Sequence, residues 1–217
     1  TVYGTLLNFR DELEHLAPQM NQPPYKAPPK APVLYVKTAN TWSASGADVP
    51  VPPNIAAIEV GATIAMTIGP LAQESIGLLA IPSIAGYVLM NDFSVPHASF
   101  FRPPVRFKCL DGFQGIGNQR VSTEAAGDPS HFKLQVRING DLCQTVDFSR
   151  MVRDARTLLA DVSEFMTLRE GDVLMLGCNC LPGGGRPLAK VGDCIEISAP
   201  AMPAFGTLTN LLVKEST

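Results

Sequence analysis

The stretch Ile58-Glu59-Val60-Gly61-Ala62-Thr63-Ile64-Ala65-Met66-Thr67-Ile68-Gly69 decides the fold of this chain. It is mostly apolar and rich in β-branched residues, a composition typical of strands. It therefore predicts a strand from Glu59 to Ile68. Glu59 is its only acidic residue, which matters for the chemistry considered below.

Further strands are predicted on both sides of this one. Short apolar runs bounded by turn residues are typical of such strands, and they lie at residues 2–7, 33–37, 86–90, 173–177, 194–198 and about 206–213. Two more, at residues 132–138 and 142–146, flank Asn139-Gly140. Asn-Gly suits a tight primed turn, so this pair predicts a β-hairpin.

Two helices are expected among these strands. Asn8 offers a side-chain oxygen that could cap a helical turn running to about His15. Apolar residues recur at helical spacing from Ser149 to Met166, which predicts one long amphipathic helix. The fold class is therefore α+β and mainly β, and residues 1–217 are expected to form a single domain.

Proline is dense between residues 23 and 53, which disfavours helix and predicts a lid or extended surface segments, with the strand at 33–37 as the exception. Gly183-Gly184-Gly185 lacks the Lys-Ser/Thr and the helix start of a phosphate-binding loop, so we interpret it as a plain turn.

Composition excludes several classes of function. The net charge of -3 and the scattered Lys and Arg residues argue against nucleic acid as a partner. No uninterrupted apolar run reaches the ~20 residues that a membrane span needs, and no secretory signal is evident. The 5 cysteines, without Cys-x-x-Cys spacing, are expected to be reduced, and a cytoplasmic location is expected.

The order of short blocks along the chain resembles the fumarylacetoacetate hydrolase superfamily. The blocks are Leu7-Asn8-Phe9, Val33 to Lys37, Gly86 to Asp92, Lys108 to Gly112, Ile138-Asn139-Gly140 with Gln144, Glu170 to Val173, and Gly192-Asp193. Within that superfamily, the segments Gln22 to Lys30 and Phe100 to Pro103, with Lys108 to Gly112, look most like the homoprotocatechuate (4-hydroxyphenylacetate) pathway decarboxylase/isomerases. This chain is similar to their amino-terminal half.

This resemblance implies a β-rich roll, usually dimeric, that acts on 2-oxo acids. Loss of carbon dioxide or movement of a proton in a conjugated 2-oxo acid leaves negative charge on the 2-oxo oxygen. In the family, Mg²⁺ or Mn²⁺ held by carboxylates stabilises that enolate. A homodimer, or a heteromer with a sister subunit that keeps an intact metal site, is the expected assembly.

The resemblance also assigns metal ligands, and two of them are missing. Asp92 matches the family's metal-binding aspartate, although a turn or cap carboxylate is the alternative. The family's two glutamates fall at Gly61 and Thr63. Glu59 has the same strand parity and is the candidate replacement, although it lies about 6.5 Å further back along the strand than residue 61.

The remaining candidates concern proton transfer and substrate binding. Glu12 and His15 stand where the family has a His and a Glu in the opposite order, so they could form an acid/base pair or simply a solvated helix end. Family lysines match at Lys37 and at Lys108, which is assigned a catalytic role. Lys37, Arg102, Arg106 and Cys178 are the candidates for substrate binding, with surface side chains as the alternative.

The resemblance implies a decarboxylase/isomerase subunit that acts on an unsaturated 2-oxo dicarboxylic or tricarboxylic acid in aromatic catabolism. The substrate type is 5-oxopent-3-ene-1,2,5-tricarboxylate or 2-hydroxyhepta-2,4-diene-1,7-dioate. The alternatives are a catalytically degenerate companion subunit, a module that binds small carboxylates, and an acylpyruvate-type hydrolase.

Overall fold

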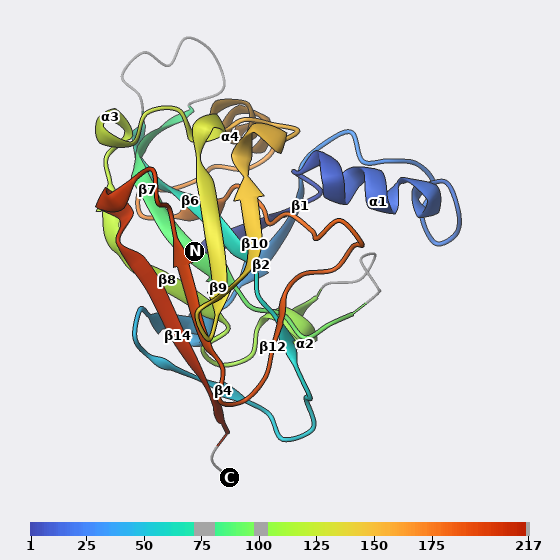
Figure 1. Ribbon diagram of the computed structural model, residues 1–217. Coiled ribbons are helices and arrows are strands. Elements are labelled where there is room, and N and C mark those ends of the chain that lie inside the picture. Colours follow the sequence, from blue (N-terminus) through green and yellow to red (C-terminus); the bar gives the residue numbers. More distant parts are fainter. Residues whose placement is uncertain (72–80, 98–103, 216–217) are drawn as a thin grey trace.

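The computed structural model describes residues 1–71, 81–97 and 104–215 (Figure 1). Strand β6 (Ala62–Leu71) lies in the middle of the largest sheet, between β7 (Pro82–Asp92) and β11 (Val173–Met175). From Ala62 to Ile68 every residue of β6 except Thr67 is buried. A strand covered on both faces has a nearly continuous apolar sequence, which explains the opening stretch.

This sheet has seven strands in the order β2-β1-β11-β6-β7-β8-β3. Its other strands are β1 (Val2–Leu6), β2 (Val33–Lys37), β3 (Trp42–Ala44) and β8 (Gln114–Val121). The order interleaves strands from both ends of the chain, so β1 pairs in parallel with β11 from the last third. Strands from distant parts of the sequence therefore lie beside β6 and β7 in one sheet.

A second sheet has five strands in the order β10-β9-β13-β14-β4. They are β4 (Asp48–Val51), β9 (Lys133–Ile138), β10 (Asp141–Asp147), β13 (Cys194–Ser198) and β14 (Thr207–Lys214). The predicted hairpin is confirmed as β9 and β10. Asn139 and Gly140 both have positive φ, 54° and 89°, as a primed turn requires.

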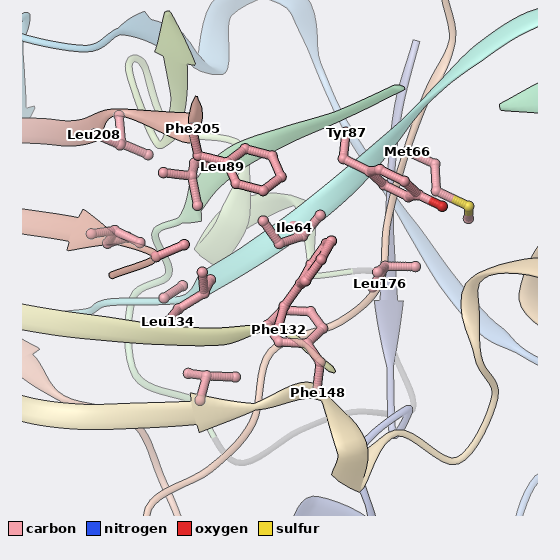
Figure 2. Close-up of a cluster of buried hydrophobic side chains, with 14 of the residues drawn as sticks. Ile64, Met66, Tyr87, Leu89, Phe132, Leu134, Phe148, Leu176, Phe205 and Leu208 are labelled. Atoms are coloured by element: carbon pink, nitrogen blue, oxygen red, sulfur yellow. The ribbon is translucent and has the colours of Figure 1, made fainter. Parts of the chain in front are cut away.

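The hydrophobic core lies between these two sheets (Figure 2). Ile64 and Leu89 of the large sheet are buried in the same cluster as Leu134 and Leu208 of the small one. Phe132 makes edge-on ring contacts with Tyr87, Phe148 and Phe205, at the positions shown in Figure 2. Aromatic rings of this kind bury large areas, and the predicted mainly-β α+β fold is confirmed.

The helices differ from the prediction in their limits. Helix α1 (Arg10–Met20) projects to one side of the sheets in Figure 1, and its N-cap is Phe9 rather than Asn8. Asn8 instead donates from its side-chain amide to the carbonyls of Arg153 and Leu176, because it is buried against those loops. The short helices are α2 (Val105–Lys108) and α3 (Thr123–Ala126).

The predicted long helix is too long at both ends. Helix α4 covers only Ala155–Ser163, because Asp154 accepts a hydrogen bond from the Thr157 N–H and caps it there. Residues 148–150 form a separate 3₁₀ turn. The apolar periodicity continues through this turn, so it could not reveal the cap.

The predicted strand Glu59–Ile68 is also interrupted. Ile58–Glu59 form β5, which pairs with β12 (Leu188–Ala189) in a separate two-stranded sheet. The backbone of Val60 donates to the carbonyl of Pro187, away from the β6 ladder. Glu59 and residue 61 therefore do not belong to one continuous strand, and the predicted shared parity is wrong.

Residues 23–31 of the proline-rich segment are exposed except for the half-buried Tyr25, as expected of surface segments, but the end of the segment contributes to the core. Strand β4 carries Pro50 but buries Val49 and Val51 completely or nearly so. All five cysteines are free thiols. Within the described residues, no helix has both the length and the hydrophobicity to cross a bilayer.

Candidate functional site

Asp92 is the centre of a buried ionic cluster. It is the last residue of β7, it has no exposed surface, and its backbone N–H donates to the carbonyl of Gly61. The Nζ of Lys37 lies 2.9 Å from its Oδ1, and the Nζ of Lys108 lies 2.6 Å from its Oδ2. Tyr35 donates its hydroxyl to Oδ2. One carboxylate therefore contacts two ammonium groups and a phenol.

Two different elements bring these partners to Asp92. Tyr35 and Lys37 are two residues apart on β2, so their side chains leave the same face of the sheet. Lys108 is the last residue of α2, and its Nζ also lies 4.6 Å from the centroid of the Tyr35 ring. The block order in the sequence predicted the importance of Lys37, Asp92 and Lys108, but the ion pairs among them follow only from the fold.

Arg186 joins the cluster and was missed in the sequence. Its Nη1 lies 3.6 Å from Asp92 Oδ2 and its Nη2 lies 3.8 Å from Glu12 Oε1, and its side chain is 9% exposed. It directly follows Gly183-Gly184-Gly185, for which the sequence predicts a plain turn. The position of Arg186 directly after this glycine turn is the sequence feature that could have indicated a role in the site.

The charges of the cluster fix the ionisation of Asp92. Burial alone would raise the pKa of this carboxyl, but Lys108, Lys37 and Arg186 outweigh burial and hold the pKa well below its usual value. Burial also lowers the pKa of Lys37. Asp92 is therefore ionised at neutral pH, and the cluster of Lys37, Lys108, Arg186 and Asp92 carries excess positive charge.

A cavity of about 220 Å³ opens beside this cluster. It is lined by Leu6, Glu12, His15, Leu16, Gln19, Glu59, His97, Lys108, Cys180, Gly185 and Arg186. Lys108 and Arg186 thus contact Asp92 on one side and face the cavity on the other. The structure brings four of the predicted site residues, Glu12, His15, Glu59 and Lys108, to one hollow.

Glu12 is the buried acid of this cavity. Its Oε2 accepts a hydrogen bond of 2.8 Å from the Leu7 N–H, and burial raises the pKa of its carboxyl even though Arg186 opposes the shift. His15 lies one turn further along α1 and is exposed, with its ring against Gly184. The pair shares one helix face, as the spacing of three predicts.

The raised pKa of Glu12 predicts a pH dependence of stability. The folded state binds this proton more tightly than the unfolded chain, so the contribution is full below the ordinary pKa of 4.5 and is lost as pH rises through the folded-state pKa. Glu12→Gln removes the titration. We expect the variant to lose less stability than the native chain between about pH 4 and about pH 7.

Urea unfolding of both proteins across that pH range measures this difference. The midpoint of Glu12→Gln relative to the native midpoint should rise steadily with pH. Two parallel curves would mean that Glu12 titrates normally in the folded state.

Gly61 and Thr63, the positions where the resemblance in sequence places two glutamates, are closed to metal-binding side chains. A Cβ on Gly61 would overlap the carbonyl oxygen of Asp92, so no side chain fits there without moving β7. Thr63 is fully buried and donates its hydroxyl to the carbonyl of Gly177. Neither position offers an oxygen to an ion in the cavity.

The residues present do not fit a divalent cation. Hard cations such as Mg²⁺ and Mn²⁺ need several oxygen ligands, usually carboxylates. Asp92 is instead surrounded by the three cationic side chains, and Glu59 is left as a cavity carboxylate near Glu12. Within residues 1–71, 81–97 and 104–215, no three His, Cys, Asp or Glu residues are grouped as a metal would require.

Other predicted substrate contacts lie away from the cavity. Lys37 is 2% exposed and also donates to the carbonyl of Phe93, so it lies beneath the cavity. Arg106 is exposed on α2, and Arg102 lies outside the described residues. Cys178 is buried, and burial raises the pKa of its thiol to about 11, so it is a neutral thiol at physiological pH.

A second, more apolar hollow of about 250 Å³ adjoins the cavity. The two share Leu6, Glu12, Leu16 and Gln19 from β1 and α1. Tyr25, Ala27 and Pro29 of the proline-rich segment form its outer wall. Part of this segment therefore lies beside the site, and its role as a lid stays a prediction.

Comparison with protein families and curated sequences gives a consistent set of relatives. The model of the fumarylacetoacetate (FAA) hydrolase C-terminal family matches residues 1–213. The chain is 35% identical over 207 residues to the 4-hydroxyphenylacetate degradation bifunctional isomerase/decarboxylase of Escherichia coli. That match covers 94% of this chain but 45% of the relative, so the chain spans about half its length. The human mitochondrial oxaloacetate tautomerase FAHD2A is 27% identical over 193 residues, which cover 85% of this chain and 60% of that protein.

Solved structures share the fold. The 2-hydroxyhepta-2,4-diene-1,7-dioate isomerase from Mycobacterium marinum matches with a TM-score of 0.73 and 23% identity, covering 100% of this chain and 75% of that one. The fumarylpyruvate hydrolase from Pseudomonas aeruginosa, in complex with Mn²⁺ and pyruvate, matches with a TM-score of 0.74 and 18% identity, covering 99% of this chain and 89% of that one.

Proposed function

The chain belongs to the fumarylacetoacetate hydrolase family, whose C-terminal-domain model it matches over residues 1–213, and from this we propose that it is a decarboxylase/isomerase subunit for unsaturated 2-oxo acids. The isomerase/decarboxylase of Escherichia coli, at 35% identity, supports this reaction class. A cytoplasmic location and assembly as a dimer or with a sister subunit are part of the proposal. A divalent metal is not, because the side chains present do not fit one.

The observation that carries the proposal is the meeting of Lys108, Arg186 and Glu12 at one cavity. A 2-oxo acid presents a carboxylate and a carbonyl oxygen, which an ammonium and a guanidinium can bind together. Glu12 has a raised pKa and can hold a proton next to these cations. Anion binding and proton transfer are therefore available in the same hollow.

These side chains suit enolate chemistry. In isomerisation the ionised Glu12 would accept the proton of the breaking C–H bond, whose electron pair moves through the conjugated system onto the 2-oxo oxygen, whereas in decarboxylation the breaking C–C bond supplies that pair and carbon dioxide leaves. Lys108 and Arg186 would stabilise the resulting oxyanion. Glu12 would return a proton to carbon, with His15 at the cavity mouth exchanging protons with solvent.

A companion subunit is the second candidate, and one specific observation favours it. Positions 61 and 63 hold Gly and Thr in place of the family's glutamates. A sister subunit with complete ligands would then perform the chemistry, and this chain would bind the same class of anion without turnover.

Activity of the purified chain tests the proposal. With 2-hydroxyhepta-2,4-diene-1,7-dioate as substrate, we expect loss of the conjugated absorbance, and we expect Glu12→Gln to slow it by about 100-fold because the proton donor is removed. Glu14→Gln, an exposed neighbour on the same helix, is the matched control and should leave the rate unchanged. Binding without turnover would favour the companion subunit, and absence of binding would contradict both candidates.

A further inference from the structure

We propose that Lys108 and Arg186 bind the anionic head of the substrate directly, and that this pair takes the place that a divalent cation would occupy. The inference rests on the proposed function, since it names how the same site holds a 2-oxo carboxylate. It follows from three independent features of the site: its charge, its closed ligand positions and one unsatisfied donor.

The charge balance of the cluster favours an anion over a cation. Lys37, Lys108 and Arg186 lie within 4 Å of the single carboxylate of Asp92. The cavity also holds the carboxyl groups of Glu12 and Glu59, and burial raises the pKa of Glu12 towards its neutral form, so the three cations outnumber the ionised carboxylates when Glu12 is protonated. A divalent cation would be repelled at this short range, whereas a carboxylate or enolate would be attracted.

Packing around residues 61 and 63 also excludes metal ligands, whatever the charge of the cluster. The carbonyl oxygen of Asp92 occupies the space that a side chain on residue 61 would need. The hydroxyl of Thr63 donates to the Gly177 carbonyl. Gly61, just before β6, and Thr63, inside it, are both buried. Ligands for an ion therefore cannot be supplied from this strand without displacing β7.

The unsatisfied donor points to a ligand. The Nη1 of Arg186 is buried and makes no hydrogen bond within the described part of the chain, although its side chain lines the cavity and is 9% exposed. A buried N–H without an acceptor is costly, and an oxygen of a bound carboxylate would satisfy it. Lys108 uses Asp92 Oδ2 as an acceptor, and an ammonium has further N–H groups to offer.

Asp92 then has a positioning role rather than a ligand role. It fixes the Nζ of Lys108 at 2.6 Å and the guanidinium of Arg186 at 3.6 Å, so both cations are held in place before the anion arrives. Such preorganisation reduces the entropy cost of binding.

Calorimetry with oxalate, a planar mimic of the 2-oxo carboxylate, tests the inference. We expect oxalate to bind the purified chain equally well in excess EDTA and in Mn²⁺. Arg186→Gln should weaken binding about tenfold or more, because one charged hydrogen bond is lost. Arg150→Gln, the same change at a partly exposed arginine paired with Asp11, is the control and should leave the affinity unchanged.

Three results would overturn the inference: oxalate binding that requires Mn²⁺, no oxalate binding in either condition, or an unaltered affinity in Arg186→Gln. Should Arg186→Gln fail to fold, Arg186→Lys keeps the charge but loses the guanidinium fork, and it should still weaken oxalate measurably. The two proposals fail separately. Turnover that depends on Mn²⁺ would contradict the metal-free site but support the proposed reaction class. Oxalate binding in EDTA without any turnover would support the metal-free site but contradict the proposed reaction by this chain.

Discussion

Asp92→Asn is expected to lower the free energy of unfolding by about 3–5 kcal/mol, because it leaves buried cations without their counter-ion. Lys37 and Lys108 are 0% and 2% exposed at the side chain and contact Asp92 at 2.9 and 2.6 Å. The pKa of Lys37 is already lowered by burial, so loss of its proton would limit the cost. Urea unfolding followed by circular dichroism measures the change.

Asp161→Asn is the matched control for this prediction. Asp161 pairs with Arg153 at 2.7 Å, but the two side chains are 32% and 19% exposed, so water compensates for the lost charge. We expect a loss below about 1 kcal/mol. Equal losses in the two variants would mean that Asp92 does not hold the buried cations in place.

Gly61→Ala is expected to destabilise the chain by about 3 kcal/mol, the upper part of the range for overpacked buried sites. The new methyl would overlap the carbonyl oxygen of Asp92, and a backbone atom in a central strand cannot rotate away as a side chain could. Gly61→Glu, which introduces a carboxylate, should lose at least as much stability and gain no Mn²⁺ affinity. Thermal and urea unfolding, with Mn²⁺ titration of the Glu variant, measure these outcomes.

Gly183→Ala provides the comparison at a glycine with open surroundings. A Cβ at residue 183 would meet no atom within 4 Å, so we expect little change in stability. If Gly61→Ala were as well tolerated as Gly183→Ala, the backbone of β7 at Asp92 would be able to shift with little loss of stability. The steric part of the metal-free inference would then be lost.

The two predictions share one physical origin, which is the packing of β7 against the chain at residues 60–63. The Asp92 N–H donates to the Gly61 carbonyl, and the Asp92 carbonyl fills the space beside Gly61. The same contact holds the Asp92 carboxylate under Lys108 and Arg186. Stability and anion binding are therefore coupled at this residue.

Family membership and much of the secondary structure were predictable from the sequence. The block order predicted the fumarylacetoacetate hydrolase family, which is confirmed by the match over residues 1–213. Strands such as Val33–Lys37 and Cys194–Ser198 were predicted with their observed limits, because local apolar runs bounded by turn residues encode them. The hairpin at Asn139-Gly140 was predicted for the same local reason.

Errors arose where a long-range contact overrides a local pattern. Asn8 looked like a helix cap, but its side chain bonds to Arg153 and Leu176, more than a hundred residues away. The strand through Glu59 looked continuous, but Val60 pairs with Pro187 and separates β5 from β6. Neither partner is visible in a local window of sequence.

By itself the sequence determined which residue types were available, among them Asp92, Lys37 and Lys108, with glycine at position 61 and threonine at position 63. Only the tertiary structure decided what they form together. It added Arg186 from a distant turn and placed three cations around one buried carboxylate. The physical reason is that burial makes charge balance a property of side chains that meet in space, and the strand order brings together residues separated by more than a hundred positions.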